Sequence, residues 1–168
     1  VSISSVSVEL AKKIFGDFKK YNILLVGAGE TAVNAAIHFQ SAGAREFIVV
    51  NRSEERGRRV AERFGGEYMP LHRLSDACVR ADIAVFATGA QTHLLDEESM
   101  RNIMSARRRR QVLVIDISNP RNVDPAAGNP DGVFLYNIDH LEQIVRENLR
   151  GRADQIPAAE GIIADFVE

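Results

Sequence analysis

The stretch ILLVGAGETAVNAAIHFQSAGAREFIVVNRS, residues 23–53, decides the fold of this chain. It begins with an unbroken apolar run at residues 23–26, which is typical of a strand buried on both faces. A glycine-rich turn then opens a helix predicted over residues 31–41, and residues 47–50 form a second apolar strand. We therefore expect the remaining chain to complete a sheet around this unit.

Length and composition set broad limits on the kind of protein. The 168 residues suffice for one domain with a single core, and the 45% hydrophobic and 26% charged residues exclude a disordered chain or a coiled-coil rod. A formal charge of −2 gives no overall attraction for nucleic acid, so such a partner would need a local basic patch.

The expected location is a reducing cytoplasm without membrane attachment. The single cysteine, Cys78, cannot form an internal disulfide, and no cationic region followed by an apolar core marks a signal peptide. No apolar run reaches the roughly 18 residues that a membrane-spanning helix needs. Because the chain begins with Val1 rather than Met, we interpret it as a fragment excised from a longer protein.

Helices and strands alternate along the rest of the chain, which favours a Rossmann-like, doubly wound parallel sheet with helices on both faces. An entry helix over residues 5–20 is expected to be capped by Ser4 or Ser5. The other predicted helices cover residues 54–64, 73–79 and 96–106. The other predicted strands lie around residues 68–69 and over 83–87, 112–117 and 133–136.

A final helix is predicted to begin at Asp139 and to be interrupted by Gly151 and Pro157. One side of it carries an apolar stripe, formed by Leu141, Ile144, Val145 and Leu149. With the sheet already complete, we expect this stripe to pack on another chain or on a missing domain, or the helix to fray.

Gly27, Gly29 and Ala32 form a G-x-G-x-x-A pattern between the first strand and its helix. Alone, such a pattern also occurs as a purely structural turn, but this context is the one that a dinucleotide-binding site requires. Gly27 permits the tight turn, Gly29 lets a pyrophosphate approach the backbone, and Ala32 lets the helix pack close to the strand. The N–H groups at the helix N-terminus then face the anion.

The end of the second strand favours NADP over NAD. NAD enzymes carry an acidic residue there for the ribose 2′-hydroxyl, whereas this chain has Asn51, Arg52 and Ser53. The guanidinium of Arg52 can pair with a 2′-phosphate and Ser53 can donate a hydrogen bond to it, with Arg56 as a further candidate contact. The alternative is that Arg52 is a solvated strand-end residue and Ser53 only a helix cap.

Two further groups of residues are expected near a bound dinucleotide. In the usual strand order the fourth strand lies beside the first, so Thr88, Gly89 and Ala90 line the crevice, unless they form a plain strand-to-helix turn. Asp116, at the end of the fifth strand, either holds a ligand or braces the loop that leads to Pro120.

Other candidate residues are assigned no chemistry. Cys78 lacks a nearby histidine pattern and is predicted to be a buried small hydrophobic residue rather than a nucleophile. The histidines have no metal-ligand spacing, so we predict no metal; they are His38, His72, His93 and His140, of which His93 follows the crevice loop. Residues 107–110, four arginines, are interpreted as a solvated helix end rather than a nucleic-acid contact.

The motifs together closely resemble the middle domain of the glutamyl-tRNA reductase family over almost the whole chain. They are VSISSVSVELAKKIFG, LLVGAGETA, VVNRS, FATGA, VIDISNPRNVDP and LYNIDHLEQIVRENL. The resemblance implies that the domain binds NADPH and that residues 139–168 begin a spinal helix leading to a dimerisation domain. It implies the following cofactor contacts: Gly27, Ala28, Gly29, Glu30, Thr31 and Ala32 at the pyrophosphate, Asn51, Arg52 and Ser53 at the 2′-phosphate, and Thr88, Gly89 and Ala90 near the nicotinamide.

The resemblance also implies an activity for the complete protein. A cysteine in a missing catalytic domain attacks glutamyl-tRNA, and NADPH reduces the thioester to glutamate-1-semialdehyde for tetrapyrrole biosynthesis. The dinucleotide-binding part, residues 21–138, would then bind cofactor without turnover, and the full protein would dimerise through a missing C-terminal domain. The alternatives are a shikimate dehydrogenase-like NADP domain and a non-catalytic NADP-sensing module.

Overall fold

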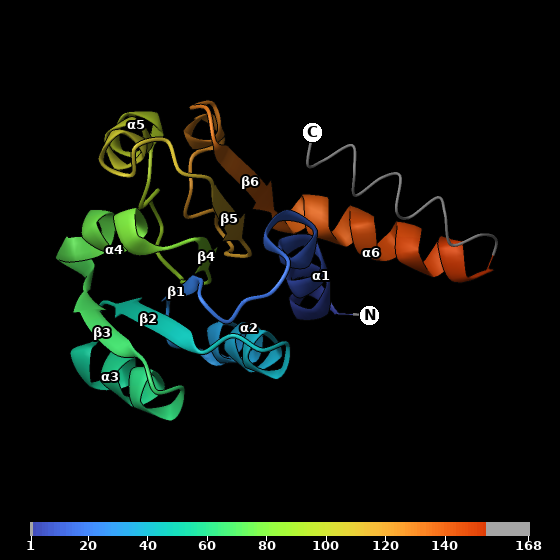
Figure 1. Cartoon of the computed structure of the whole chain (residues 1–168), viewed down its shortest axis with the longest axis horizontal. Coiled ribbons are helices and arrows are strands. Elements are labelled where there is room, and N and C mark those ends of the chain that lie inside the picture. Colours follow the sequence, from blue (N-terminus) through green and yellow to red (C-terminus); the bar gives the residue numbers. More distant parts are fainter. Residues whose placement is uncertain (1, 154–168) are drawn as a thin grey trace.

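The computed structural model describes residues 2–153 and consists of one sheet of six parallel strands with helices on both faces (Figure 1). The strand order is β3-β2-β1-β4-β5-β6, so β4 lies beside β1 as predicted. The strands are β1 (Asn22–Val26), β2 (Glu46–Asn51), β3 (Glu67–Pro70), β4 (Ile83–Phe86), β5 (Val112–Asp116) and β6 (Val133–Asn137). The predicted fold class is confirmed.

Two layers of helices cover the sheet. The helices are α1 (Ile3–Phe15), α2 (Glu30–Ser41), α3 (Glu54–Arg63), α4 (Leu74–Arg80), α5 (Glu97–Ala106) and α6 (Ile138–Ala153), with short 3₁₀ turns at Leu71–Arg73 and Pro125–Gly128. Helices α1, α2, α3 and α6 share one hydrophobic cluster with the sheet, whereas α4 and α5 pack in a second cluster on the opposite face. No helix within residues 2–153 is long and apolar enough to cross a membrane.

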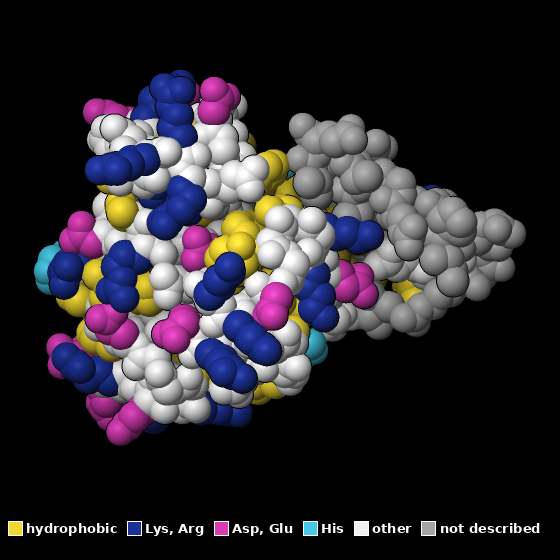
Figure 2. Space-filling model, viewed as in Figure 1, with side chains coloured by type: hydrophobic (Ala, Val, Ile, Leu, Met, Phe, Trp, Pro, Cys, Tyr) yellow, Lys and Arg dark blue, Asp and Glu magenta, His cyan; other side chains and the backbone are white. Residues whose placement is uncertain are grey.

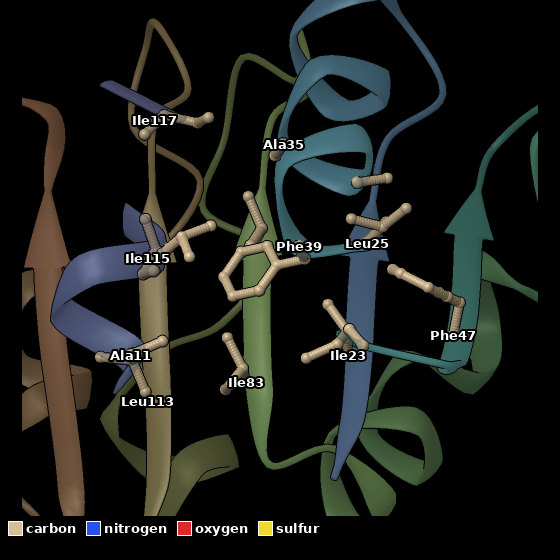
Figure 3. Packing of buried hydrophobic residues seen from close by; sticks show 14 of the residues in the cluster. Ala11, Ile23, Leu25, Ala35, Phe39, Phe47, Ile83, Leu113, Ile115 and Ile117 are labelled. Carbon is tan, nitrogen blue, oxygen red and sulfur yellow. The ribbon is translucent and has the colours of Figure 1, made fainter. Parts of the chain in front are cut away.

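Strand β1 shows why an unbroken apolar run was required. Ile23 and Leu25 point into the first cluster, where Phe39 of α2 packs beside them (Figure 3). Leu24 and Val26 point into the second cluster, and all four β1 side chains are fully buried. A polar residue at any of these positions would be buried without water on either face.

The ends of α1 differ from the prediction. Ser2, not Ser4 or Ser5, caps the helix: its hydroxyl accepts the backbone N–H of Ser5, and the Ser5 hydroxyl accepts the N–H of Ser2, each at 3.0–3.1 Å. The helix ends at Phe15 rather than Lys20, because Gly16 adopts a left-handed conformation with φ 74°.

Helix α6 corrects two expectations. Gly151 does not interrupt it, because the helix continues to Ala153, while Pro157 lies outside the described residues. Leu141 and Ile144 are buried in the cluster that also holds α1, so the first half of the stripe packs within this chain. Leu149 is 53% exposed, and Figure 1 shows this end of α6 extending away from the sheet.

Arg107 also departs from the prediction of a solvated helix end. The three arginines that follow it are exposed, but Arg107 is only 4% exposed. Its guanidinium donates hydrogen bonds to the carbonyl oxygens of Cys78 (3.0 Å), Val79 (2.9 Å) and Ala81 at the end of α4. No further helical turn follows to supply N–H donors to these carbonyls. The Arg107 side chain, which follows α5, therefore caps the C-terminus of α4.

Candidate functional site

A groove of about 630 Å³ lies at the carboxyl ends of β1, β2 and β4, where the chain after β1 crosses to β2 on one side and the chain after β4 crosses to β5 on the other. Ligands of doubly wound sheets bind at this switch point. The groove brings together most of the predicted site residues: Gly27, Ala28, Gly29, Asn51, Arg52, Ser53, Arg56, Thr88, Gly89 and Ala90. Glu30, Thr31, Ala32 and Asp116 do not line it.

The two glycines of the turn differ in whether the surrounding protein requires glycine at their positions. Gly27 has φ +122°, and a Cβ on it would lie 2.3 Å from the Ala87 carbonyl oxygen, so both its conformation and its surroundings require glycine. Gly29 has an extended backbone with φ −86°, and a Cβ there would meet no protein atom within 4 Å. Protein packing therefore does not require glycine at position 29, and the space beside it opens on the groove.

The N-terminus of α2 begins at this point. Gly29 is its N-cap, and no side chain caps the first turn. Glu30 and Thr31 are exposed on that turn, while Ala32 is fully buried, where its small side chain lets the helix pack closely. The backbone N–H groups of the first turn remain available to an anion at the groove end of the helix.

The end of β2 presents two guanidinium groups to the same groove. Arg52 and Arg56 are exposed, and among residues 2–153 neither side chain has a hydrogen bond or an ion pair. The two acidic residues that follow form ion pairs with other arginines: Glu54 pairs with Arg58 at 3.0 Å and Glu55 with Arg59 at 2.9 Å. This end of the groove is therefore locally basic, although the chain as a whole is not.

Asn51 and Ser53 shape that basic end. The Asn51 amide donates to the Ser53 carbonyl at 3.0 Å, and the Asn51 carbonyl accepts the Tyr68 hydroxyl at 3.1 Å. The Ser53 hydroxyl accepts the Arg56 N–H at 3.3 Å, so Ser53 caps α3. Its own hydroxyl proton is still able to donate into the groove.

On the face seen in Figure 2, Lys and Arg side chains are interspersed with Asp and Glu, and no broad area of one sign is present. A nucleic-acid surface would normally show a continuous basic stripe. Figure 2 shows no continuous basic stripe on this face.

The loop after β4 is tied to the loop after β5 by side chains that sequence reasoning missed. The Thr88 N–H donates to Ser118 Oγ at 3.1 Å and to Asn122 Oδ1 at 3.3 Å, and the Thr88 hydroxyl donates to the same Asn122 oxygen at 2.7 Å. The Ala90 N–H donates to the Thr88 hydroxyl at 3.1 Å. No spacing rule marks Ser118 or Asn122, because the partners are 30 or more residues apart.

Asp116 braces this second loop. Its carboxylate is 1% exposed and accepts the N–H groups of Ser118 at 3.1 Å and of Asn122 and Val123 at 2.9 Å. Of the two roles considered for it, the contacts in this structure are those of a loop brace. It borders a separate pocket of about 380 Å³ beside β6 rather than the main groove.

The remaining candidates lie away from the groove. Cys78 is buried and free, as predicted, and burial raises the pKa of its thiol to about 12, which makes a nucleophilic role unfavourable. His93 follows the groove residue Thr92 but does not line the groove; its Nδ1 lies 3.8 Å from Oδ2 of Asp124. Within residues 2–153, no three His, Cys, Asp or Glu side chains are grouped to hold a metal ion. Sequence reasoning also missed Leu71, Gln91, Thr92 and Leu94 as lining residues.

A family model described as shikimate / quinate 5-dehydrogenase matches residues 9–144, which include the sheet and the whole groove. The chain belongs to the shikimate / quinate 5-dehydrogenase family. Within this family, the curated relatives decide which members it is most like.

Those relatives are glutamyl-tRNA reductases. The chain is 43% identical over 167 residues to the one from Trichlorobacter lovleyi and 41% identical over 165 residues to one from Nitratidesulfovibrio vulgaris. These matches cover 99% and 98% of this chain but only 38% and 37% of the length of the relatives. The resemblance predicted from the motifs is confirmed, and the chain spans well under half of these proteins.

Solved structures lead to the same members of the family. Glutamyl-tRNA reductase from Methanopyrus kandleri matches with a TM-score of 0.84 and 37% identity over 99% of this chain and 42% of that one. The nucleotide binding domain of the Thermoplasma volcanium enzyme matches with a TM-score of 0.71 and 25% identity, over 92% of this chain and 98% of that one. Shikimate dehydrogenase from Mycobacterium tuberculosis shares the fold, with a TM-score of 0.57 and 17% identity over 98% of this chain and 61% of that one.

Proposed function

We propose that this chain is the NADPH-binding domain of a glutamyl-tRNA reductase. The observation that carries the proposal is the pair of guanidinium groups, Arg52 and Arg56, which face the groove without a carboxylate partner among the described residues. A groove that ends in two such groups suits a dinucleotide with an additional phosphate on its ribose. The whole-chain similarity to glutamyl-tRNA reductases supports the same assignment.

The residues present fit this cofactor at each part of the groove. The open space beside Gly29 and the uncapped first turn of α2 suit a pyrophosphate, and Arg52, with Ser53, suits a 2′-phosphate. Thr88, Gly89 and Ala90 would border the nicotinamide. When bound, NADPH supplies the hydride that reduces a glutamyl thioester to glutamate-1-semialdehyde in tetrapyrrole biosynthesis.

The reacting cysteine would belong to another part of the full protein. Cys78 is 3% exposed and its thiol is held neutral, so it is no candidate for attack on glutamyl-tRNA. We infer that this chain binds the cofactor and has no turnover alone. The full protein would act on glutamyl-tRNA in the cytoplasm and dimerise through a domain beyond this chain.

Titration of the purified chain with NADPH and with NADH, followed by nicotinamide fluorescence, tests the cofactor assignment. We expect NADPH to bind at least about tenfold more tightly, because a charge-assisted phosphate–guanidinium pair contributes more than a neutral hydrogen bond. Equal affinities for the two nucleotides would overturn the 2′-phosphate argument.

A shikimate dehydrogenase-like domain remains the second candidate, since the family model that matches residues 9–144 carries that description. The gene sequence upstream of Val1 separates the two candidates. A catalytic domain with a reactive cysteine supports the reductase, and a shikimate-binding domain there would exclude it. A reading frame that started near Val1 with no catalytic domain would instead support an NADP-sensing module.

A further inference from the structure

Asn122 holds both ends of the loop that lines the far end of the groove, although it does not line the groove itself. Its side-chain oxygen accepts the N–H and the hydroxyl of Thr88, at 3.3 and 2.7 Å. Its main-chain carbonyl accepts the N–H groups of Leu94 at 2.6 Å and Leu95 at 3.4 Å. One fully buried residue therefore sets where the loop between β4 and α5 begins and where it ends.

Asn122 is in turn fixed to the sheet. The Asp116 carboxylate, at the end of β5, accepts the Asn122 N–H at 2.9 Å and the Ser118 N–H at 3.1 Å, and the Ser118 hydroxyl donates to the Asn122 oxygen. Asp116 is paired in the sheet with Phe86, the last residue of β4. The position of the loop is thus determined from β5, through Asp116 and Asn122, to Thr88.

We propose that Asn122 is a positioning residue for the nicotinamide half of the cofactor. The inference rests on the proposed function and deepens it by assigning the two halves of the groove to different supports. Among the described residues, Arg52, Ser53 and Arg56, which follow β2, have no hydrogen bond with Asn122, whereas Thr88 is bonded to it directly and Ala90 through Thr88.

The hydrogen bonds of the Asn122 side chain favour this role over simple core packing. Its oxygen accepts hydrogen bonds from Thr88 and Ser118, yet its amide nitrogen is buried without a partner among the described residues. A buried amide donor without a partner is destabilising, so this side chain is not optimal for core packing alone. The oxygen is the part of this side chain that the site uses.

Three variants test the proposal with two ligands. Asn122→Leu keeps the approximate size and removes the oxygen, Asn122→Asp keeps an acceptor oxygen, and Ser118→Ala removes one support while deleting a single atom. Asn102→Leu, at an exposed position on α5, is the control for an asparagine replacement outside the network. The ligands are NADPH, which carries the nicotinamide, and 2′,5′-ADP, which does not. Binding is measured by calorimetry on chains whose fold is checked by circular dichroism.

We expect Asn122→Leu to bind NADPH about tenfold more weakly and 2′,5′-ADP within about twofold of the unaltered chain. Asn122→Asp should restore NADPH affinity to within about threefold, and Ser118→Ala should lose about threefold for NADPH alone. Asn102→Leu should change neither affinity. If Asn122→Leu does not fold, Ser118→Ala decides the question by the same criterion.

The possible failures are distinguishable. An unaltered chain that binds neither ligand removes the proposed function and this inference together. An unaltered chain that binds both, with a folded Asn122→Leu variant that binds NADPH equally well, overturns the inference alone. Equal losses for both ligands would show that Asn122 supports the whole fold and not the nicotinamide end.

Discussion

Gly27 lies so close to Ala87 that a Cβ built on it would be 2.3 Å from the Ala87 carbonyl oxygen. The contact joins the turn after β1 to the end of β4, two of the strands that border the groove. Gly29, two residues later, has no such neighbour. The pair therefore allows the structural and the ligand-binding requirements of one motif to be separated.

We predict opposite effects for alanine at these two positions. Gly27→Ala should lower the free energy of unfolding by about 3 kcal/mol, because a Cβ clashes with backbone and the conformation is strained. Gly29→Ala should change stability by less than about 1 kcal/mol but weaken NADPH binding at least about tenfold, since the methyl group fills space that the pyrophosphate needs. Urea unfolding and fluorescence titration measure the two effects. Full cofactor affinity in Gly29→Ala would contradict the pyrophosphate assignment.

Arg52 is predicted to set the preference for the phosphorylated cofactor. Arg52→Ala should remove most of the difference between NADPH and NADH affinity while leaving NADH binding nearly unchanged, because only NADPH carries the 2′-phosphate. Arg59→Ala is the control, since Arg59 lies on α3, the helix just after Arg52, but pairs with Glu55 and does not line the groove. A preference that survives in Arg52→Ala would move the phosphate contact to Arg56.

Arg107 is predicted to be essential for stability without contacting the cofactor groove. Arg107→Met should lower the free energy of unfolding by about 3 kcal/mol, because the carbonyls at the end of α4 would lose their charged donor. Arg108→Met, at the adjacent exposed position, should change it by less than about 0.5 kcal/mol. Chemical denaturation of both variants measures the difference, and similar values would argue against the capping role.

His140 is predicted to make the start of α6 sensitive to acid. Its Nδ1 accepts the Asn137 N–H at 3.1 Å, and burial, with the positive charge of Arg121, lowers its pKa despite the opposing charge of Asp139. Because the unfolded chain binds the proton more readily, this contribution to stability is present above a pH of about 6.5 and is lost as the pH falls. His140→Gln keeps an acceptor that does not titrate. Its unfolding free energy should therefore fall less than that of the unaltered chain between pH 7 and pH 5, and identical pH profiles would contradict the prediction.

Local patterns were sufficient wherever the controlling neighbours lie close in sequence. The buried strand at residues 23–26, the G-x-G-x-x-A turn and the arginines after β2 were all readable, because periodicity and turn chemistry act over a few residues. The predicted helix ends were less accurate, as the cap at Ser2 and the continuation of α6 through Gly151 show. A single glycine does not end a helix that is buried along one side against another helix.

The sequence by itself determined the fold class, the groove and its basic end, because apolar spacing and glycine positions encode those directly. Only the tertiary structure decided what Asp116, Arg107 and Asn122 do. Asp116 binds N–H groups two to seven residues ahead, in a loop whose course no periodicity predicts. The partners of Asn122 and Arg107 lie in other elements, 34 residues away for the Asn122–Thr88 pair and 26–29 residues away for the carbonyls at the end of α4 that Arg107 binds. Hydrogen bonds between such distant groups leave no periodic signal in the chain.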